Sequence, residues 1–498
     1  KTVGLALFII GFGIFIASFF MESYLITKDL LKEQLGTKAE LLEKNSKIIG
    51  KNYGNSLSLV QDLDETFGAV NDQQLSTYGI TEEEIESLVS KNENNFQLAS
   101  LDQVFDDGEI DAYKKKTFKD YGGWLDGREF RSKDEMQVQI SNVVNNIKLY
   151  QIVNEKGFDK YKIKDLKYSL TKASSTGPIS SSPGLFLVLT YAVCIVGALL
   201  YILPKIQDGP PGIKNNGIFH RAMTNVGWLG VLTGTFLILF YIVLYFYPEY
   251  MTSWIITVDP ISQFLKGSDA GRFFLYGFIY TLCILVMGVR MIIKYRHSKY
   301  QILRTVSVMF FQTAFAFLIP EILLRLNQPY FDFKNLWALD YDFFFDNELN
   351  TLVAYGGFGF FMLGWGIALI ILGVPVFVYF FGKRWYCSWV CGCGGLAETL
   401  GDPYRQLSDK SVKAWKIERW MIHSVLVFAV VMTGGVLYTY WTGNSQIFGI
   451  SSYDVRSVYG AWIGAGFAGV VGTGFYPLMG NRVWCRFGCP LAAYLGLV

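Results

Sequence analysis

Charged side chains are scarce in this sequence. Only 17% of its 498 residues are Asp, Glu, Lys or Arg, whereas about a quarter is usual in soluble domains. The formal net charge is +2 and no long basic run occurs, so the composition argues against a nucleic-acid-binding protein. The chain has three His, and residues 21–183 contain neither His nor Cys. That absence excludes a CxxCH haem attachment site, a zinc site and a disulfide from this region.

Apolar residues are abundant instead, at 51% of the chain, and the few charges are unevenly spread. Residues 21–183 carry 27 acidic and 21 basic side chains, whereas the remaining 335 residues carry 15 acidic and 23 basic ones. The sequence therefore joins an acidic polar domain to a much more apolar, slightly basic part.

A helix of about 20 apolar residues crosses a bilayer core. Eight segments qualify, at roughly 3–20, 184–203, 225–247, 273–293, 305–324, 354–381, 421–440 and 458–479. The first is too long for a signal-peptide core and lacks a small-residue cleavage site, so we interpret it as a retained anchor. We expect a polytopic α-helical membrane protein of about eight spans. Its parts are a first span (1–20), a polar domain (21–183), spans two to six (184–381), and two cysteine motifs with spans seven and eight (382–498).

The Lys and Arg residues of the short loops predict the orientation of these spans. Loops 204–224, 290–304, 382–420 and 480–498 carry 3, 5, 7 and 2 basic residues, and the alternate loops 248–272, 325–353 and 441–457 carry 2, 2 and 1. We expect the first set on the cytoplasmic side. Both chain ends then lie inside and residues 21–183 lie outside, which agrees with an even number of spans.

The polar domain is expected to be an α/β extracytoplasmic domain between spans one and two. Residues 26–49 have the apolar spacing of a helix, and residues 135–154 mix β-branched and polar residues in a way that fits paired strands or a helix. On the same side, the aromatic and acidic loop 331–348 suits either a docking surface or an interfacial belt in the headgroups.

Five of the seven cysteines fall into two groups with one pattern. Cys194 and Cys283 lie alone inside spans, where Cys is an ordinary small apolar residue. The stretches GKRWYCSWVCGCGGLAETLG (382–401) and GNRVWCRFGCPLAAYLG (480–496) share G-x-R-x-aromatic-C-x-aromatic-x-C at an offset of 98 residues. Both follow a span on the predicted cytoplasmic side, where thiols stay reduced and metal ligation is favoured. We predict that the two span–cysteine units are pseudo-symmetric.

The spacing predicts a metal centre. Two Cys at i and i+4 on one helical turn point to the same side, so two facing turns supply four thiolates. Four is the number that holds an iron–sulfur cluster, and the ligands would be Cys387, Cys391, Cys485 and Cys489. Cys393 has no counterpart in the second motif, and it fits either a further metal ligand or a free thiol.

The residues beside these cysteines suit the same role. Arginines next to the thiols are expected to lower their pKa by charge proximity. Aromatic side chains are expected to shield a cluster from water and so tune its potential. The arginines are Arg384, Arg482 and Arg486, and the aromatic residues are Trp385, Tyr386, Trp389, Trp484 and Phe487.

On these motifs the chain resembles the membrane-bound iron–sulfur proteins with paired CxxxCP motifs. That family includes the membrane electron-transfer subunits of the periplasmic nitrate reductase and nitrous oxide reductase systems, and cytochrome oxidase accessory proteins of the same architecture. The resemblance covers about 354–498 and implies a [4Fe-4S] cluster on the four paired cysteines. It also implies electron transfer at the cytoplasmic face of a bacterial inner membrane, as part of a respiratory or redox complex rather than as a stand-alone catalyst. The implied partners are membrane or periplasmic redox proteins, quinone and the lipid bilayer.

Two departures from the family are visible. The first motif reads C-G-C-G where the family usually has C-P, which leaves its ligand set open. Family members also usually continue into a ferredoxin-like segment with two CxxCxxCxxxCP runs, and this sequence ends at Val498, where such a segment would begin. We therefore expect a longer polypeptide whose tail carries two further clusters.

Other functions remain open at this point. Paired thiolates also bind Cu(I), so the alternative is a copper-handling or reductase-type accessory factor in cytochrome oxidase assembly, although Met-rich and His-rich tracts are missing. A transporter or sensor lacks support, because the spans show no matched broken helices.

Two further features bear on cofactors and protons. His220 and His423 are the only candidates for a facing haem pair, but His at span ends more often snorkel to the interface, so we expect no haem. Glu321 is an ionisable residue at membrane depth and hence a functional candidate, although an ion pair with Arg325 is the favoured interpretation.

Overall fold

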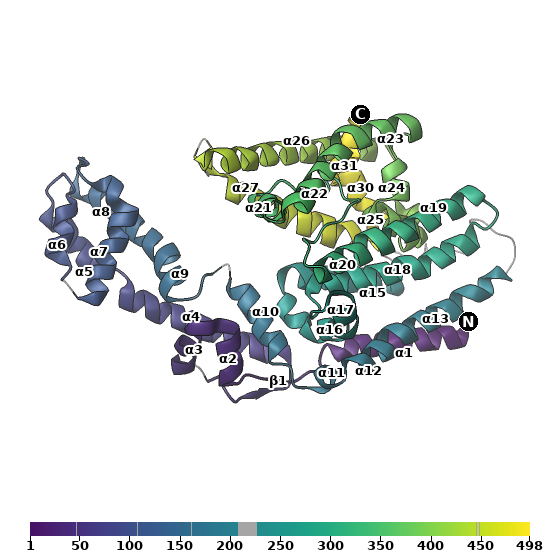
Figure 1. The fold of residues 1–498 in the computed structure, drawn as a ribbon, viewed down its shortest axis with the longest axis horizontal. Helices are drawn as coiled ribbons and strands as arrows, with labels where there is room; N and C mark the ends of the chain where they lie inside the picture. Colours follow the sequence, from purple (N-terminus) through teal and green to yellow (C-terminus); the bar gives the residue numbers. More distant parts are fainter. Residues whose placement is uncertain (46, 107, 161, 208–226, 445, 448) are drawn as a thin grey trace. The chain divides into compact units, whose positions relative to one another are not determined.

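The computed structural model describes residues 1–498 apart from 46, 107, 161, 208–226, 445 and 448 (Figure 1). The chain forms two compact units, one made of Lys1–Phe19 with Ser182–Val498 and one made of Phe20–Ser181. The second unit covers nearly the same residues as the polar domain expected at 21–183. Both units are mostly helical, and the strands among the described residues form two short antiparallel pairs. These are β1 (Tyr24–Leu25) with β2 (Asn52–Tyr53), and β3 (Gln446–Ile447) with β4 (Ile450–Ser451).

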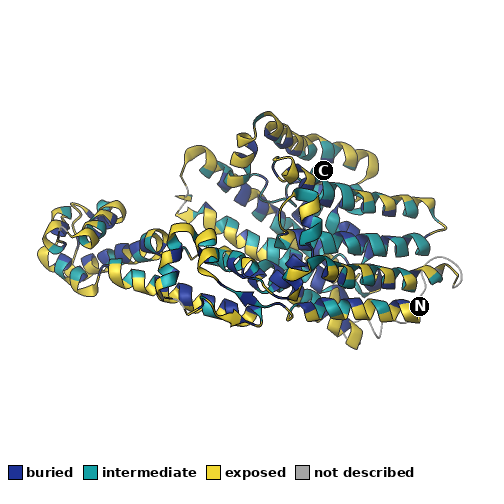
Figure 2. Cartoon of the chain, turned by 60° about the horizontal axis from the view of Figure 1, so that its bottom comes forward, coloured by how far each residue is buried: buried dark blue, intermediate teal, exposed yellow. Residues whose placement is uncertain are grey.

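Among the described residues of the first unit, six helical stretches are long and apolar enough to cross a membrane. Only 17% to 33% of the residues in their apolar windows are buried inside the protein, so most of these side chains are at least partly exposed (Figure 2). Outward-facing apolar surface on this scale supports a membrane protein. The stretches are Pro183–Ile202, Trp228–Phe246, Arg272–Lys294, Lys299–Arg325, Gly356–Phe381 and Val412–Thr442.

Three of these stretches contain a π-helical segment between two α-helices. They consist of α12 (Pro183–Leu187), η5 (Val188–Ala192) and α13 (Val193–Ile202); of α19 (Lys299–Phe310), η8 (Phe311–Leu318) and α20 (Ile319–Arg325); and of α22 (Gly356–Ala368), η9 (Leu369–Gly373) and α23 (Val374–Phe381). The other three are the single helices α15 (Trp228–Phe246), α18 (Arg272–Lys294) and α26 (Val412–Thr442).

The first and last of the eight predicted spans are not among the six. Helix α1 (Thr2–Ser18) is apolar but shorter, at 17 residues. The segment predicted as the last span is helical but rich in Gly, which lowers its mean hydropathy. It consists of α27 (Ser452–Tyr459), the π-helical η11 (Gly460–Val471), α28 (Gly472–Gly474) and α29 (Tyr476–Met479).

Helix α1 lies directly against α13, and glycines allow the close approach. A Cβ atom on Gly4 would lie 2.6 Å from the backbone nitrogen of Tyr201, and one on Gly197 would lie 2.5 Å from that of Phe8. Small residues permit such backbone contact between helices in membranes. Helix α1 is thus packed closely into the bundle.

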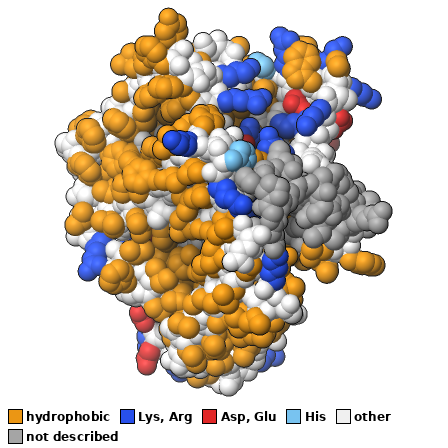
Figure 3. Space-filling view, turned by 90° about the vertical axis from the view of Figure 1, so that its right-hand side faces the viewer, with side chains coloured by type: hydrophobic (Ala, Val, Ile, Leu, Met, Phe, Trp, Pro, Cys, Tyr) orange, Lys and Arg blue, Asp and Glu red, His pale blue; other side chains and the backbone are white. Residues whose placement is uncertain are grey.

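The remaining helices of this unit are short. They are α16 (Thr252–Ile256), α17 (Asp259–Lys266), α21 (Asp346–Ala354), α24 (Trp385–Trp389), α25 (Gly392–Thr399), α30 (Val483–Phe487) and α31 (Pro490–Leu497). Figure 3 faces the end of the bundle at which α18 gives way to α19, and Lys and Arg side chains gather over part of that face with few acidic ones. One of the basic loops that predict the orientation, 290–304, belongs to this end.

The segment 326–345, which connects α20 to α21, is folded into the bundle. Leu336, Ala338 and Phe343 are between 1% and 7% exposed. Ala338 belongs to a core cluster with Ala429 and Met432 from α26. This segment makes up most of the loop 331–348, so several apolar residues of that loop are used in packing within the protein.

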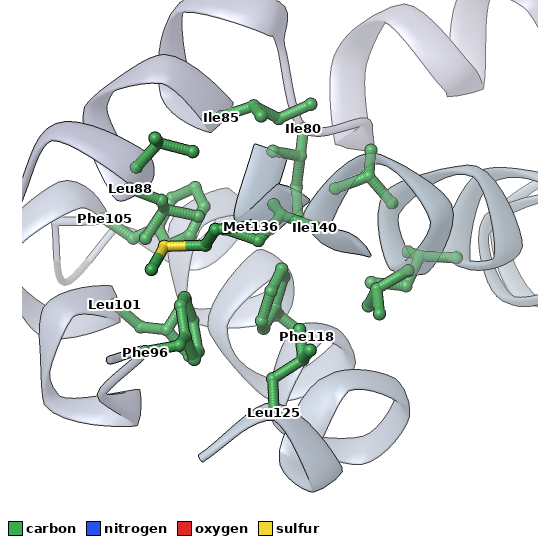
Figure 4. Packing of buried hydrophobic residues seen from close by; sticks show 14 of the residues in the cluster. Ile80, Ile85, Leu88, Phe96, Leu101, Phe105, Phe118, Leu125, Met136 and Ile140 are labelled. Atoms are coloured by element: carbon green, nitrogen blue, oxygen red, sulfur yellow. The ribbon is translucent and has the colours of Figure 1, made fainter. Parts of the chain in front are cut away.

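The second unit contains two hydrophobic cores. One is formed by α2 (Lys28–Leu35), α3 (Ala39–Asn45), part of α4 (Ser56–Tyr78) and α10 (Ile163–Ala173). The other, shown in Figure 4, is formed by residues between Ile80 and Ile152. The long helix α4 contributes Leu63 and Phe67 to the first core and Leu75 to the second, so it joins the two. The other helices are α5 (Glu82–Lys91), α6 (Leu101–Val104), α7 (Glu109–Gly122), α8 (Lys133–Asn146), α9 (Val153–Lys156) and α11 (Pro178–Ser181).

The second unit is therefore helical rather than α/β, with only the β1–β2 pair as sheet. Helices α2 and α3 lie within 26–49, as predicted, but residues 135–154 are helical as well. Ser132 caps α8 by accepting a hydrogen bond from the Glu135 backbone nitrogen at 3.2 Å, and Glu135 in turn accepts one from the Arg131 backbone at 2.9 Å. Apolar residues at helical spacing, Met136, Ile140 and Val144, then enter the core. The sequence Ser132-x-x-Glu135 is therefore the feature that distinguishes a helix from paired strands in this segment.

The end of the second unit is held by a buried carboxylate, that of Glu22. It accepts hydrogen bonds from the backbone nitrogens of Gly177, Ile179 (3.0 Å) and Ser180 (3.2 Å), and from the Ser180 hydroxyl (2.8 Å). The Glu22 side chain thus fixes the backbone of residues 177–180, which precede Pro183.

We expect Glu22→Gln to increase the local opening of residues 177–180. The amide cannot accept all of these bonds, and a buried N–H group left without a partner costs about 1–3 kcal/mol. Hydrogen–deuterium exchange at Gly177, Ile179 and Ser180 should accelerate about tenfold, as 1.4 kcal/mol implies. The control is Glu33→Gln on the exposed face of α2. Equal exchange in both variants would contradict this role of Glu22.

Candidate metal centre

The first cysteine motif forms two short helices with a break between them. Cys387 lies within α24, and the helix ends at Trp389. Cys391 adopts an extended backbone (φ −65°, ψ 135°) and is the residue that precedes α25. The two cysteines therefore lie on either side of a helix end.

The second motif repeats this local structure. Cys485 lies within α30, and Cys489 (φ −81°, ψ 110°) precedes α31. The backbone nitrogen of Cys391 donates to the carbonyl of Tyr386 at 2.8 Å, and that of Cys489 donates to the carbonyl of Trp484 at 3.0 Å. The two motifs are thus structural repeats. The spacing predicts that the two cysteines of each motif lie on one helical turn. This prediction is wrong, because the helix ends before the second cysteine of each motif.

Each motif begins at a glycine in a conformation that other residues avoid. Gly382 has φ +77° and Gly480 has φ +83°. At Gly480 a Cβ atom would also lie 2.4 Å from the Ser408 hydroxyl. The G-x-R start of both motifs therefore reflects the sharp turn that leads the chain from a helix into the cysteine-bearing segment.

The fold brings all five cysteines of the two motifs into one buried cluster. Cys391 and Cys489 are 3% and 4% exposed, and Cys387, Cys393 and Cys485 pack against the same core. That core includes Leu336, Val374, Tyr386, Trp484, Leu491 and Leu495. All seven cysteines of the chain are free thiols, and Cys194 and Cys283 are not part of this cluster.

A small cavity adjoins the cysteines. It measures about 40 Å³, and Cys393 and Cys485, one from each motif, line it together with Arg482. Thr473 and three tyrosines, Tyr276, Tyr280 and Tyr476, also contribute polar side chains to the wall. Cys393 therefore faces the second motif, and both of its predicted roles, ligand and free thiol, remain compatible with this position.

A pair of contacts locks the two motifs together. Glu398 at the end of α25 forms ion pairs with Arg304 of α19 at 3.0 Å and with Arg482 of the second motif. The side-chain amide of Asn481 donates to the carbonyl of Ala397 at 2.9 Å. These contacts fix one cysteine pair relative to the other.

The first motif packs against the middle of two spans. Gln312 of η8 donates from its side-chain amide to the carbonyl of Val390 at 2.6 Å, and the hydroxyl of Ser307 donates to the carbonyl of Trp389 at 3.1 Å. A Cβ atom on Gly392 would lie 2.7 Å from the hydroxyl of Tyr280, which lies well inside α18. The chain thus turns back into the bundle after α23, and the cysteines lie among helices.

Burial controls the protonation of these thiols more than the arginines do. Burial raises the pKa of the Cys485 thiol to about 12, although Arg482 acts in the opposite direction. Burial likewise raises the pKa of Cys387 far above its usual range, against Arg482 and Arg384. Arg486 instead pairs with Glu418. The predicted lowering by arginines is outweighed, so metal binding here would release protons from these thiols.

Cys391 is the exception among them. A hydrogen bond from Cys393 lowers the pKa of the Cys391 thiol to about 6, which outweighs the effect of burial. The first motif therefore already holds one sulfur that favours the thiolate form, the form that binds metals.

The donor set fits an iron–sulfur cluster. Within the described residues, no three His, Cys, Asp or Glu side chains are close enough to hold a single metal ion. A cluster differs in that its thiolates bind separate iron atoms, so the same four sulfurs need not converge on one point. The indole nitrogens of Trp385 and Trp484 are buried and have no hydrogen-bond partner in the described part of the chain. Sulfur atoms of a cluster accept such bonds.

The aromatic residues that are expected to shield a cluster do not all lie beside the cysteines. Trp385, Tyr386 and Trp484 pack with the cysteines as expected. The ring centroid of Trp389 instead lies 5.5 Å from that of Tyr300. The ring centroid of Phe487 lies 5.3 Å from Cζ of Arg486.

The remaining ionisable candidates that the structure describes, His423 and Glu321, contact residues outside the two cysteine motifs. His220 falls outside the described residues, and the Nδ1 atom of His423 contacts the carbonyl of Arg419, one turn earlier, at 2.6 Å. The expected Glu321–Arg325 pair does not form. Glu321 lies 3.9 Å from Lys266, whereas Arg325 donates to the carbonyl of Phe264 at 2.5 Å.

Sequence reasoning did not find the side chains that support the site. Gln312, Glu398 and Lys334 belong to segments that appeared as an ordinary span, a motif flank and an outer loop. Glu398 carried the only usable signal, since a carboxylate directly after a cysteine motif implies a basic partner. The partner of Gln312, the carbonyl of Val390, is distant in sequence and gives no local pattern.

Comparison with known families supports the same chemistry. Residues 364–416 and 460–498 match the family model described as a 4Fe-4S binding domain. The two matched stretches contain both cysteine motifs and leave out most of α26. No curated protein and no solved structure gives a significant match to the chain. The match supports an iron–sulfur cluster as the cofactor.

Proposed function

We propose that this chain is an integral membrane iron–sulfur protein that transfers electrons. The observation that carries the proposal is the gathering of two structurally repeated cysteine motifs in one buried cluster. Cys387, Cys391, Cys485 and Cys489 would hold the cluster, and Cys393 is a candidate fifth ligand. A [4Fe-4S] cluster held there would supply reversible one-electron chemistry.

The residues around the cysteines suit that chemistry. Leu336, Tyr386 and Trp484 exclude water from the sulfurs, and the buried indole nitrogens offer hydrogen bonds. Gln312 and Glu398 hold the segments that carry the first cysteine pair. A rigid, dry environment of this kind favours electron transfer over reactions of the cluster with solvent.

The cellular setting is also part of the proposal. The basic loops favour an orientation in a bacterial inner membrane with the cysteine motifs toward the cytoplasm and residues 21–183 outside. The protein would serve a respiratory or redox complex and exchange electrons with membrane or periplasmic redox proteins and with quinone. We propose no nucleic-acid partner, which agrees with the lack of a basic run.

Reversible reduction of the protein tests this function. The full chain, purified anaerobically in detergent, should take up electrons from dithionite, give an electron paramagnetic resonance signal, and lose that signal when a quinone analogue is added as oxidant. Protein that binds copper and shows no such reversible signal would instead favour the copper-handling alternative.

A further inference from the structure

The segment 326–345 reaches the cysteine cluster from an unexpected direction. It precedes the helical stretch Gly356–Phe381, whereas the first cysteine motif follows that stretch. At 1.5 Å per residue, 26 helical residues separate the two ends by about 39 Å. Nevertheless the hydroxyl of Tyr386 donates to the carbonyl of Lys334 at 2.7 Å, so the segment and the motif both turn back into the bundle and meet there.

The approach of this segment is visible in contacts along the helix. The indole nitrogen of Trp365, in α22, donates to the carbonyl of Phe333 at 2.8 Å. Leu336 then packs in the same core as Tyr386 and Cys391. Irregular backbone at membrane depth is tolerated where protein surrounds it, and here the surrounding protein is the candidate metal centre.

The segment brings a buried cation to that centre. The side chain of Lys334 is 6% exposed, and its ammonium lies 2.7 Å from Oδ2 of Asp332. The other carboxylate oxygen of Asp332, Oδ1, accepts a hydrogen bond from the Lys334 backbone nitrogen at 3.2 Å. Removing two charges from water is costly, so a buried pair is weak evidence for a purely stabilising role. Leu336, two residues further along, packs in the same core as Cys391, so the buried cation belongs to a segment that contacts the cysteine cluster directly.

We propose that Lys334, held in place by Asp332, raises the reduction potential of the cluster in this protein. The inference rests on the proposed function and specifies how this chain tunes it. Each electron that the cluster accepts makes the site one unit more negative. A fixed cation in a site of low dielectric constant stabilises that added charge, and a nearby anion opposes it. Lys334 is a positioning residue for charge and is not a metal ligand.

The pair allows a test with opposite signs. In a redox titration of the anaerobically purified full chain, with dithionite as reductant and the paramagnetic signal as readout, Lys334→Met should lower the midpoint potential. Asp332→Asn should raise it, because the neighbouring cation is then less compensated. Lys334→Arg should keep the wild-type value. The control is Lys413→Met, an exposed lysine of α26, which should leave the potential unchanged.

The outcomes separate this inference from the proposed function. A wild-type protein without a cluster would overturn both. A cluster whose potential is the same in all variants would overturn only the role of Lys334. Loss of the cluster from both Lys334→Met and Asp332→Asn, or a shift of both in one direction, would assign the pair a structural role and would also overturn the inference.

Discussion

Replacing any one of Cys387, Cys391, Cys485 and Cys489 by Ser is expected to remove the iron–sulfur cluster from the purified protein. Serine keeps the size of the side chain but is a poor iron ligand, and burial favours the protonated forms of the Cys387 and Cys485 thiols. Iron and acid-labile sulfide should fall below about a tenth of the wild-type content, measured by chemical analysis of full-length protein.

The two lone cysteines are matched controls for this experiment. Cys194 and Cys283 lie in α13 and α18, outside the cysteine cluster, so their Ser variants should keep the cluster. Cys393→Ser separates the two roles left open for that residue: loss of iron identifies a ligand, and retention identifies a free thiol. Equal iron contents in all these variants would contradict the assignment of the site.

Replacing Asp402 by Ala is expected to cause a large decrease in the free energy of unfolding. Its side chain is 2% exposed and lies between Arg290 (2.9 Å) and Lys294 (2.8 Å), both on α18. Removing one partner of such a network leaves charges unpaired in a buried position, which costs about 3–5 kcal/mol. Because the same pairing ties the end of the first motif to α18, thermal denaturation followed in detergent should begin at a clearly lower temperature than in the wild type.

The control for Asp402 is Asp409→Ala. Asp409 is exposed, and its carboxylate contacts only Ser411 among the described residues, so removing it should cost little. If the two variants denatured at the same temperature, the Asp402 network would have no special role in the fold.

The repeated local structure of the two cysteine motifs was more predictable from sequence than the structure around them. Two copies of G-x-R-x-aromatic-C-x-aromatic-x-C at one offset were enough to predict a structural repeat, because a repeated local pattern folds in the same way twice. The assumption of one helical turn through each pair failed, since Val390 and Gly488 end the helices before the second cysteine. Residue spacing alone does not show where a helix of five residues stops.

The errors elsewhere have physical causes of the same kind. The α/β expectation gave weight to β-branched residues at 135–154 and overlooked the cap formed by Ser132 and Glu135. The loop 331–348 was assigned to the outer side from the small number of basic residues in its loop, a signal that carries no information on burial. Asp332 pairs with Lys334, two residues further along, and both side chains are largely buried. Their burial depends on segments distant in sequence, so it leaves no periodic signal.

Metal and sulfide analysis of the anaerobically purified protein tests the central claim most directly. Iron and acid-labile sulfide in nearly equal amounts, with a paramagnetic signal that appears on reduction with dithionite, is the predicted result. Protein that contains copper or zinc in their place, or that retains neither iron nor sulfide when handled without oxygen, would contradict the assignment of an iron–sulfur centre to the paired cysteine motifs.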